Sequence, residues 1–448
     1  SGDLISVVTP GISIDGKGAR GSLRLDYGFS GIFNARDSSA NRHQNTLNAV
    51  GKVEAIENWL FVDGLGTISQ QYLNPVGAVS PGSANFNTNQ TETSHYSLSP
   101  YVKGKLFSSV DYLLRYRLST TSSKSNAVAD LQSNEWITKL NGTTPLSAVT
   151  WSFDADSIYN DYSFGKDYES TNYSLTLGYR LNPEWRFSVN AGQESNNYLS
   201  ESQQTRNNYG YGFVWTPAPL TELSAFKNKR FFGDGYEVSF KHRMKRAQIY
   251  YRASKDVSYL PSTVNNNLGI TSYDFYYLQL AATNPDLSPQ AVRSEVLKLL
   301  QQYNIPLNGS VIASSLTNGP NLNKLQELSL AILGVRNTVT LTITDSDRQP
   351  FVPNLDQLMS NRVRQRGIGI VWANQLTGTT SLSISLNHQQ ARSYGNSQQE
   401  TTTDGAFLFL STNISPKTQG NIGFRRVFSD GTVHYSESAL TGGISHSF

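Results

Sequence analysis

The sequence predicts an all-β protein: a transmembrane antiparallel β-barrel of about 20 strands with one helical insertion. Three observations predict this fold. Apolar and polar residues alternate in many segments, as they do in a strand with one face on lipid and the other on a lumen. Tight turns alternate with long polar connections along the chain. The last ten residues also form a strand-like pattern in which Leu440, Ile444 and Phe448 share one apolar face.

The composition narrows the class of protein. The chain has 448 residues, two Met and no Cys, which excludes disulfides and thiolate metal sites. No run of eighteen apolar residues occurs, so a helical membrane protein is excluded. Aromatic residues make up 11% of the chain and the mean hydropathy is −0.40, which suits a chain that is apolar only at alternate positions. The formal charge of +3 argues against a nucleic-acid partner.

Period-2 alternation recurs from one end of the chain to the other. Aromatic residues stand at the ends of several such segments, as Tyr173, Trp185, Tyr209 and Trp215 do, where interfacial girdles belong. The alternating segments cover residues 23–27, 102–106, 112–118, 151–155, 173–181, 185–189, 209–215, 236–240, 328–332, 339–343 and 382–386. These segments are the expected strands of the wall.

The connections between the segments predict the orientation. Short turns are expected at 182–183, 216–219, 245–246, 334–337, 377–379 and 416–417, and long polar loops at 74–93, 122–130, 196–205, 345–362 and 389–405. Counting back from Phe448 places every tight turn at one end, the periplasmic end of an outer-membrane barrel. A soluble antiparallel sandwich also alternates, but its loops have similar lengths at both ends.

The first segment, residues 4–15, is an odd extra strand in this count. Bacterial single-chain barrels have even strand numbers. Either the count divides one true strand into two, or this segment lies outside the wall of the barrel.

One region, residues 259–323, departs from the strand pattern, whereas residues 1–258 and 324–448 supply the barrel strands. Ser288 can cap a helix that Pro289 begins. Apolar residues then recur at helical spacing, at Val292, Val296, Leu299, Leu300 and Tyr303. We expect this insertion to be a plug or constriction over the pore; the alternative is a surface loop with its own small core.

Charged residues fall on the face opposite the apolar one. If the apolar faces contact lipid, the predicted lumen-lining residues that set pore selectivity are Lys103, Lys105, Arg115, Arg117, Arg180, Arg186, Lys241, Arg243 and Arg252, with Asp154 and Asp156. Basic residues outnumber acidic ones on this face about two to one, which predicts a conduit with a mild anion preference. The alternative is a structural mesh of ion pairs that fills a closed lumen.

No catalytic constellation is evident. The six His residues are scattered, and two of them, His388 and His446, fall on outward faces. None stands beside a Ser nucleophile and an acid on one inward face. We therefore expect no enzyme, no catalytic residue, no metal site and no cofactor.

Several short stretches resemble an uncharacterised family of outer-membrane β-barrels associated with PEP-CTERM/exopolysaccharide gene clusters in Gram-negative bacteria. They are residues 5–13 with Gly18-Ala19-Arg20 and Leu25-Asp26-Tyr27, then Trp215-Thr216-Pro217 with Thr221-Glu222-Leu223, Phe231-Phe232-Gly233, His242-Arg243, 289–305 and 334–338. The resemblance implies a role in export or surface assembly of an extracellular polymer.

The expected function is accordingly an outer-membrane channel that exports or passes a polar polymer such as exopolysaccharide; an anionic polymer would fit the basic lumen. The alternative is a non-conducting, plugged barrel that anchors or docks extracellular matrix or surface components. The expected partners are the lipid bilayer of the outer membrane, the barrel-assembly machinery, and polysaccharide or periplasmic export proteins, with no nucleic acid.

Overall fold

The computed structural model describes residues 2–78, 88–107, 109–258, 316–351, 362–395, 398–415, 417–431 and 434–446. These residues form one 22-stranded sheet in which every ladder is antiparallel, joined by a single short 3-10 helix, η1 (Ser38–Ala40). No helix within these ranges is long and apolar enough to span a membrane. The all-β, antiparallel part of the sequence prediction is confirmed.

The strands follow one another in chain order. They are β1 (Ile5–Val8), β2 (Gly11–Lys17), β3 (Gly21–Asn34), β4 (Arg42–Ile56), β5 (Leu60–Tyr72), β6 (Gln90–Leu106), β7 (Val110–Ser123), β8 (Leu131–Thr143), β9 (Val149–Tyr162), β10 (Tyr168–Arg180), β11 (Trp185–Asn196), β12 (Gln204–Ala218), β13 (Thr221–Arg230), β14 (Gly233–Arg243), β15 (Ala247–Ser258), β16 (Asn321–Leu333), β17 (Asn337–Pro350), β18 (Arg362–Gln375), β19 (Thr380–Tyr394), β20 (Gln399–Ser415), β21 (Thr418–Gly431) and β22 (Tyr435–His446).

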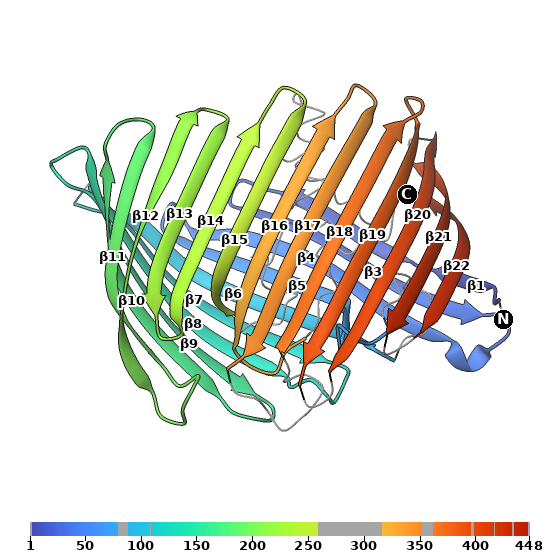
Figure 1. Cartoon of the computed structure of the whole chain (residues 1–448), viewed down its shortest axis with the longest axis horizontal. Helices are drawn as coiled ribbons and strands as arrows, with labels where there is room; N and C mark the ends of the chain where they lie inside the picture. The colour runs from blue at the N-terminus through green and yellow to red at the C-terminus, as the bar shows by residue number, and fades with distance from the viewer. Residues whose placement is uncertain are drawn as a thin grey trace.

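The sheet is a meander that curls round on itself. From β3 onward each strand pairs with the next one in the chain, up to β22. In Figure 1, β13–β21 cross the front and β3–β9 pass behind them, so the sheet has a concave and a convex face. Within the described ranges no ladder joins β22 to β1 or β2, so these strands are the two ends of the sheet.

The unplaced first segment lies in the sheet. Both β1 and β2 pair with β3 in one continuous register, with Ile5 opposite Asn34 and Gly11 opposite Gly28. Between them Pro10 lacks an N–H, but its carbonyl oxygen accepts the Phe29 N–H at 2.9 Å. They are therefore two halves of one strand at the edge of the sheet, where proline is tolerated.

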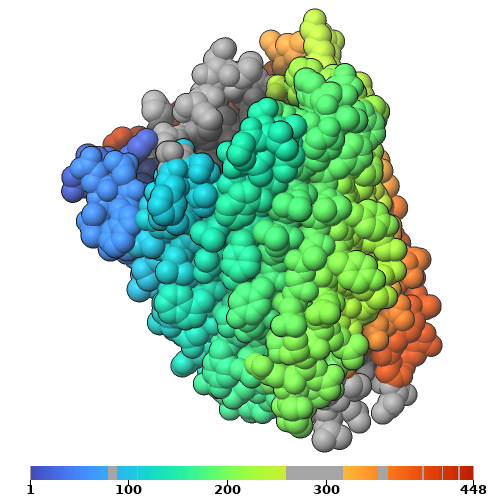
Figure 2. Space-filling model, turned by 90° about the vertical axis from the view of Figure 1, so that its left-hand side faces the viewer, coloured from blue at the N-terminus to red at the C-terminus, as the bar shows by residue number. Residues whose placement is uncertain are grey.

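The two faces of the sheet differ in polarity as the alternation predicts. On the convex face large apolar side chains stand exposed, among them Leu175, Leu177 and Tyr211 at 48%, 48% and 62%. The buried polar side chains of the concave face include Asn160 and Asn208. Figure 2, with the wall at the left of Figure 1 turned toward the viewer, shows the outer surface from teal to yellow-green as a continuous face. Apolar outside and polar inside is the arrangement of a wall in lipid.

Contrary to the prediction, the short turns are not all at one end of the sheet. Short connections after β4, β8, β10, β12, β14, β16 and β18 do lie at one end, which we name the tight-turn end. The two-residue connection Phe231–Phe232, however, joins β13 to β14 at the opposite, long-loop end. The prediction that every tight turn lies at one end is therefore wrong.

Two of the predicted long loops are partly strand. Residues 345–350 belong to β17, and most of 389–405 belongs to β19 and β20. Beyond the apolar band the alternation of hydrophobicity disappears, but the ladder continues. Cross-strand ion pairs stabilise this extension, such as Asp345 with Arg364 at 2.7 Å. A polar strand above the membrane has the same composition as a loop, so the pattern missed it.

Candidate functional site

Ion pairs cover part of the concave face on β5–β9. Arg115 donates to Asp63 at 3.1 Å, and Arg117 donates to Glu135 at 2.6 Å. The other predicted residues that have an ion-pair or amide partner are Lys105 with Asp111 at 3.7 Å, Asp154 with Lys139 at 3.8 Å, Arg252 with Glu237 at 3.5 Å, and Asp156 with Asn172 at 3.1 Å. Many of the predicted charges are therefore compensated by a neighbouring strand.

Two aromatic rings on the same face contact basic side chains. Phe61 and Tyr101 stack with their centroids 5.2 Å apart and are both buried. The Lys103 ammonium lies 4.6 Å from the Phe61 centroid, and the Arg115 guanidinium lies 4.2 Å from that of Tyr101. Cation–π contacts of this kind fix the positions of long basic side chains.

Besides Lys103, which lies over the Phe61 ring, four predicted cations form no ion pair within the described part of the chain, namely Arg180, Arg186, Lys241 and Arg243. All four are exposed and lie toward the tight-turn end. Arg180 stands directly opposite Arg186 in the β10–β11 ladder and donates to the Ser147 carbonyl oxygen at 3.3 Å. Directly opposed like charges repel each other, so this end of the concave face carries uncompensated positive charge.

An aromatic cluster occupies the long-loop end of the concave face. Tyr162 and Tyr168 meet edge to face at 5.8 Å, and Tyr198 stacks on Phe351 at 6.1 Å. Phe231, from the connection between β13 and β14, lies 5.6 Å from the Tyr198 ring. Tyr198 is only 2% exposed, and burial raises the pKa of its phenol to about 12.

A buried carboxylate fixes one side of this cluster. Glu194 of β11 is 1% exposed and accepts the Arg230 Nε–H at 2.7 Å and the Phe231 backbone N–H. The same guanidinium donates to Asp256 of β15 at 3.1 Å. A buried charge is tolerated only with such partners. The network therefore holds the Phe231–Phe232 connection to three strands.

A short piece of chain spans the long-loop end. We name residues 316–320, immediately before β16, the crossing segment. The Leu316 N–H donates to the carbonyl of Tyr72, the last residue of β5, at 3.3 Å. The Asn318 side chain accepts the Ala129 N–H at 3.1 Å and donates to the Ala127 carbonyl at 3.2 Å. Because β5 and β8 are far from β16 in strand order, this segment links separate parts of the wall across the concave side.

A second link crosses in the same region. Val76, just beyond β5, is 1% exposed, and its carbonyl accepts the hydroxyl of Thr401 in β20 at 2.6 Å. These residues are 325 positions apart in the chain. The long-loop end is thus bridged twice by described residues.

The helical insertion cannot be placed in full. Of residues 259–323, only 316–323 are described, and the last three belong to β16. The predicted constriction residues Val292, Val296, Leu299, Leu300 and Tyr303 lie outside the described residues.

The C-terminal strand is described up to His446. Leu440 and Ile444 stand out from one face of β22, 79% and 78% exposed. Phe448, the last residue of the predicted insertion signal, lies outside the described residues.

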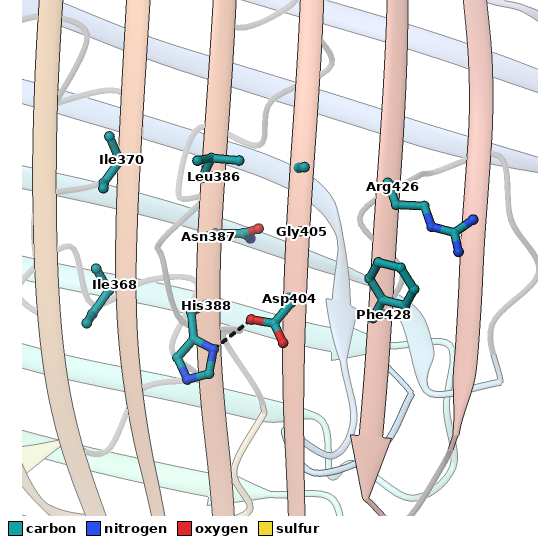
Figure 3. A pocket seen from close by; sticks show the side chains of 10 residues that line it. Ile368, Ile370, Leu386, Asn387, His388, Asp404, Gly405, Arg426 and Phe428 are labelled. Carbon is teal, nitrogen blue, oxygen red and sulfur yellow. Dashed lines mark hydrogen bonds and ion pairs between the residues drawn. The ribbon is translucent and has the colours of Figure 1, made fainter.

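A pocket of about 370 Å³ lies on the convex face over β18–β21, as Figure 3 shows. His388 and Asp404 face each other across neighbouring strands there, with Nδ1 and Oδ1 2.7 Å apart. The other lining is largely apolar, with Ile368, Leu386 and Phe428. His388 is therefore outward, as the alternation predicts, and this pair does not contribute to the concave site. The described residues also hold no group of three metal-binding side chains.

The sequence reasoning missed Glu194, Arg230 and the crossing segment. Glu194 and Arg230 are 36 residues apart, and neither stands out from its strand. Asn318 reaches a carbonyl 191 positions away. No short-range spacing encodes such contacts; only the Phe231-Phe232 pair marked this place in the sequence.

Comparison with known proteins gives the fold. No protein-family model and no curated protein matches the chain. Among solved structures, the chain resembles the FrpB iron transporter from Neisseria meningitidis, F5-1 variant, with a TM-score of 0.54 and 9% identity over 99% of this chain and 81% of that one. It also resembles the ferric-catecholate import receptor Fiu from E. coli K12, with a TM-score of 0.51 and 8% identity over 99% and 80%.

These similarities show that the chain shares the antiparallel β fold of FrpB and Fiu. Both neighbours are outer-membrane proteins, which agrees with the predicted location in that bilayer. The prediction that it is not an enzyme agrees with these neighbours, which are a transporter and a receptor.

Two predictions are corrected. The resemblance to the PEP-CTERM/exopolysaccharide family is wrong, because the chain matches no family model and shares its fold with an iron transporter and an import receptor. The predicted export of exopolysaccharide, with its docking-platform alternative, is wrong for the same reason. Apart from 289–305, which lies outside the described residues, the stretches that carried the resemblance are short pieces of strand and turn, which any large barrel shares.

Proposed function

We propose that the chain closes into an outer-membrane barrel that imports a small anionic solute, with its outer mouth shut by the crossing segment in the resting state. The observation that carries the proposal is the set of hydrogen bonds from Leu316 and Asn318 to Tyr72, Ala127 and Ala129. A solute entering from the long-loop end meets this link, so uptake requires its release. The insertion before it, residues 259–315, acts as the plug in this proposal.

The orientation and closure follow from the rules for such barrels. Short turns face the periplasm, so the long-loop end faces outward. A sheet in lipid has no free edge, and closure would bring β22 to β1 and β2. The barrel-assembly machinery is the partner proposed to act on the C-terminal strand, with Leu440, Ile444 and Phe448 as its signal.

The solute class is proposed from charge and from the neighbours. Fiu is a ferric-catecholate import receptor and FrpB is an iron transporter. Arg180, Arg186 and Arg243, which form no ion pair among the described residues, favour an anion at the inner end of the path. A ferric catecholate is anionic and aromatic, so it also fits the aromatic mouth. Arg115, Arg117 and the other predicted lumen residues are proposed to line this path.

A reversible disulfide bond between the crossing segment and the wall tests the proposal. The chain has no Cys, so Ala127→Cys with Asn318→Cys introduces the only pair of thiols. In proteoliposomes, oxidation should suppress uptake of a ferric catecholate at least tenfold, and reduction should restore it. Thr377→Cys with Thr380→Cys, at the tight-turn end, is the matched control and should oxidise without effect. Equal uptake by the locked and reduced forms would refute gating by the crossing segment.

A further inference from the structure

Three lysines form a row on the convex face. In the ladders of β13–β16, Lys227 stands opposite Tyr236, Tyr236 opposite Lys255, and Lys255 opposite Lys324. Neighbouring strands are about 4.8 Å apart, so the row extends over about 14 Å. The register puts these side chains on the same face as Leu223, which belongs to the apolar outer surface.

The row lies at the boundary of the apolar band. Toward the tight-turn end the convex face of the same strands carries Leu223, Phe240, Tyr251 and Leu328, which face one another in register. Toward the long-loop end the next pairs on this face are Lys229 opposite Asp234 on β13 and β14, and Val257 opposite Leu322 on β15 and β16. With the tight turns in the periplasm, the ammonium groups lie at the level of the outer-leaflet headgroups.

The positive charge of this surface is only partly compensated. Asp234 is shared by two ammonium groups, Lys227 at 3.2 Å and Lys229 at 3.6 Å. Lys255 and Lys324 stand directly opposite each other and form no ion pair with any described residue.

The nearest acids on the convex face are already engaged. On β17, Asp347 stands directly opposite Lys324 but binds Arg362 at 2.6 Å, while Asp345 binds Arg364 at 2.7 Å and Arg366 at 3.3 Å. Among the described residues Lys255 therefore has no acid opposite it, and Lys324 faces an acid that Arg362 already binds. Adjacent like charges destabilise a sheet unless an anion lies between them.

We propose that the row of Lys227, Lys255 and Lys324 binds the phosphate groups of a phosphorylated glycolipid headgroup in the outer leaflet. The position beside the apolar band favours a lipid over a soluble anion, because the acyl chains of the same molecule would cover that band. Tyr236 adds an amphipathic ring at the interface, and lysine stems can extend from the apolar surface to the headgroup plane. The proposal depends on the outer-membrane location and not on the imported solute.

The experiment measures binding of lipid A, with two phosphates, to the purified protein in a phosphate-free detergent. The row is neutralised by the triple substitution Lys227→Gln, Lys255→Gln and Lys324→Gln. The matched control neutralises three exposed cations in turns at the other end, by Lys245→Gln, Arg246→Gln and Lys417→Gln. We expect the row variant to bind lipid A at least tenfold more weakly, and the control to bind as the unaltered protein does.

Three results would overturn the proposal. They are equal binding by the row variant, an equal loss in the control, and displacement of lipid A from the unaltered protein by millimolar inorganic phosphate. The last would identify a site for a soluble anion. Dephosphorylated lipid A should bind the unaltered protein no better than it binds the row variant. Retained folding of each variant is checked by the heat-dependent mobility of the barrel in SDS gels.

Discussion

Glu194 illustrates how one buried charge organises the long-loop end. It is 1% exposed and binds both the Arg230 guanidinium and the Phe231 N–H. Breaking a buried pair by removal of one partner costs about 3–5 kcal/mol, because the other charge is left in a poorly solvated place. Here Asp256 still contacts Arg230, which lowers that cost.

For Glu194→Gln we therefore expect a loss of about 3 kcal/mol in unfolding free energy. Urea titration in lipid vesicles measures it. Glu184→Gln, at an exposed position in the turn between β10 and β11, is the control and should change stability by less than about 0.5 kcal/mol. An equally small effect at Glu194 would mean that its ion pair contributes little.

Tyr198 gives a prediction of pH dependence. Burial raises the pKa of its phenol to about 12, whereas an exposed tyrosine titrates near 10. The neutral phenol is the form that the closed cluster accommodates, so its contribution is complete below pH 10 and declines as the pH rises from 10 through 12.

Because the aromatic cluster opens more readily when the Tyr198 phenol ionises, limited proteolysis should cleave the chain there faster at pH 11 than at pH 9. Burial also raises the pKa of Tyr162 and of Tyr168 in the same cluster, so Tyr198→Phe removes one of three titrating phenols and should reduce that difference. An unchanged pH dependence in this variant would assign the opening to another group.

Arg180 and Arg186 test ion selectivity. They stand opposite each other without an acidic partner within the described chain, so Arg180→Glu with Arg186→Glu should shift planar-bilayer reversal potentials toward cations. The same reversal at Arg115 and Arg117 would also break the pairs with Asp63 and Glu135. Lys229→Glu on the convex face is the control. A shift no larger than in this control would count against a conducting lumen at the arginines.

At the scale of elements, the crossing segment is held by few bonds. Asn318 contributes two hydrogen bonds, to Ala127 and Ala129, and each is worth about 0.5–1.5 kcal/mol. Asn318→Ala should therefore raise the frequency of channel openings several-fold while leaving global stability nearly unchanged. Single-channel recording measures this, with Asn374→Ala at the tight-turn end as the control. Openings as rare as in the unaltered protein would show that other contacts keep the mouth shut.

The insertion before this segment is tested separately. Deletion of residues 259–315 should increase single-channel conductance if the insertion obstructs the lumen. Unchanged conductance would leave it as a surface loop.

For the whole molecule, the polarity of the wall is the main stabilising feature. Leu440 of β22 is 79% exposed on the convex face, so Leu440→Arg should cost up to about 2–4 kcal/mol in the bilayer. Ser445→Arg, on the other face of the same strand, is the matched control and should cost far less. Equal folded yields in a membrane-insertion assay would contradict the assignment of β22 to a lipid-facing wall.

The sequence by itself determined the strands, their outward faces and the preference for tight turns at one end. Period-2 alternation such as that of Tyr173, Leu175 and Leu177 is a local property, set by the pleat of each strand. It even placed His388 outward correctly. It failed at 345–350, where the ladder extends beyond the apolar band and the pattern vanishes.

Only the tertiary structure decided which residues meet across the sheet. Glu194 with Arg230, Asn318 with Ala127, Thr401 with Val76, and the row of three lysines all depend on register and on the curl of the wall. These contacts join residues tens to hundreds of positions apart, and no sequence spacing carries that information. The physical reason is that a strand specifies its own two faces, while the residues that it meets across the concave side are set by the register and curl of the whole sheet.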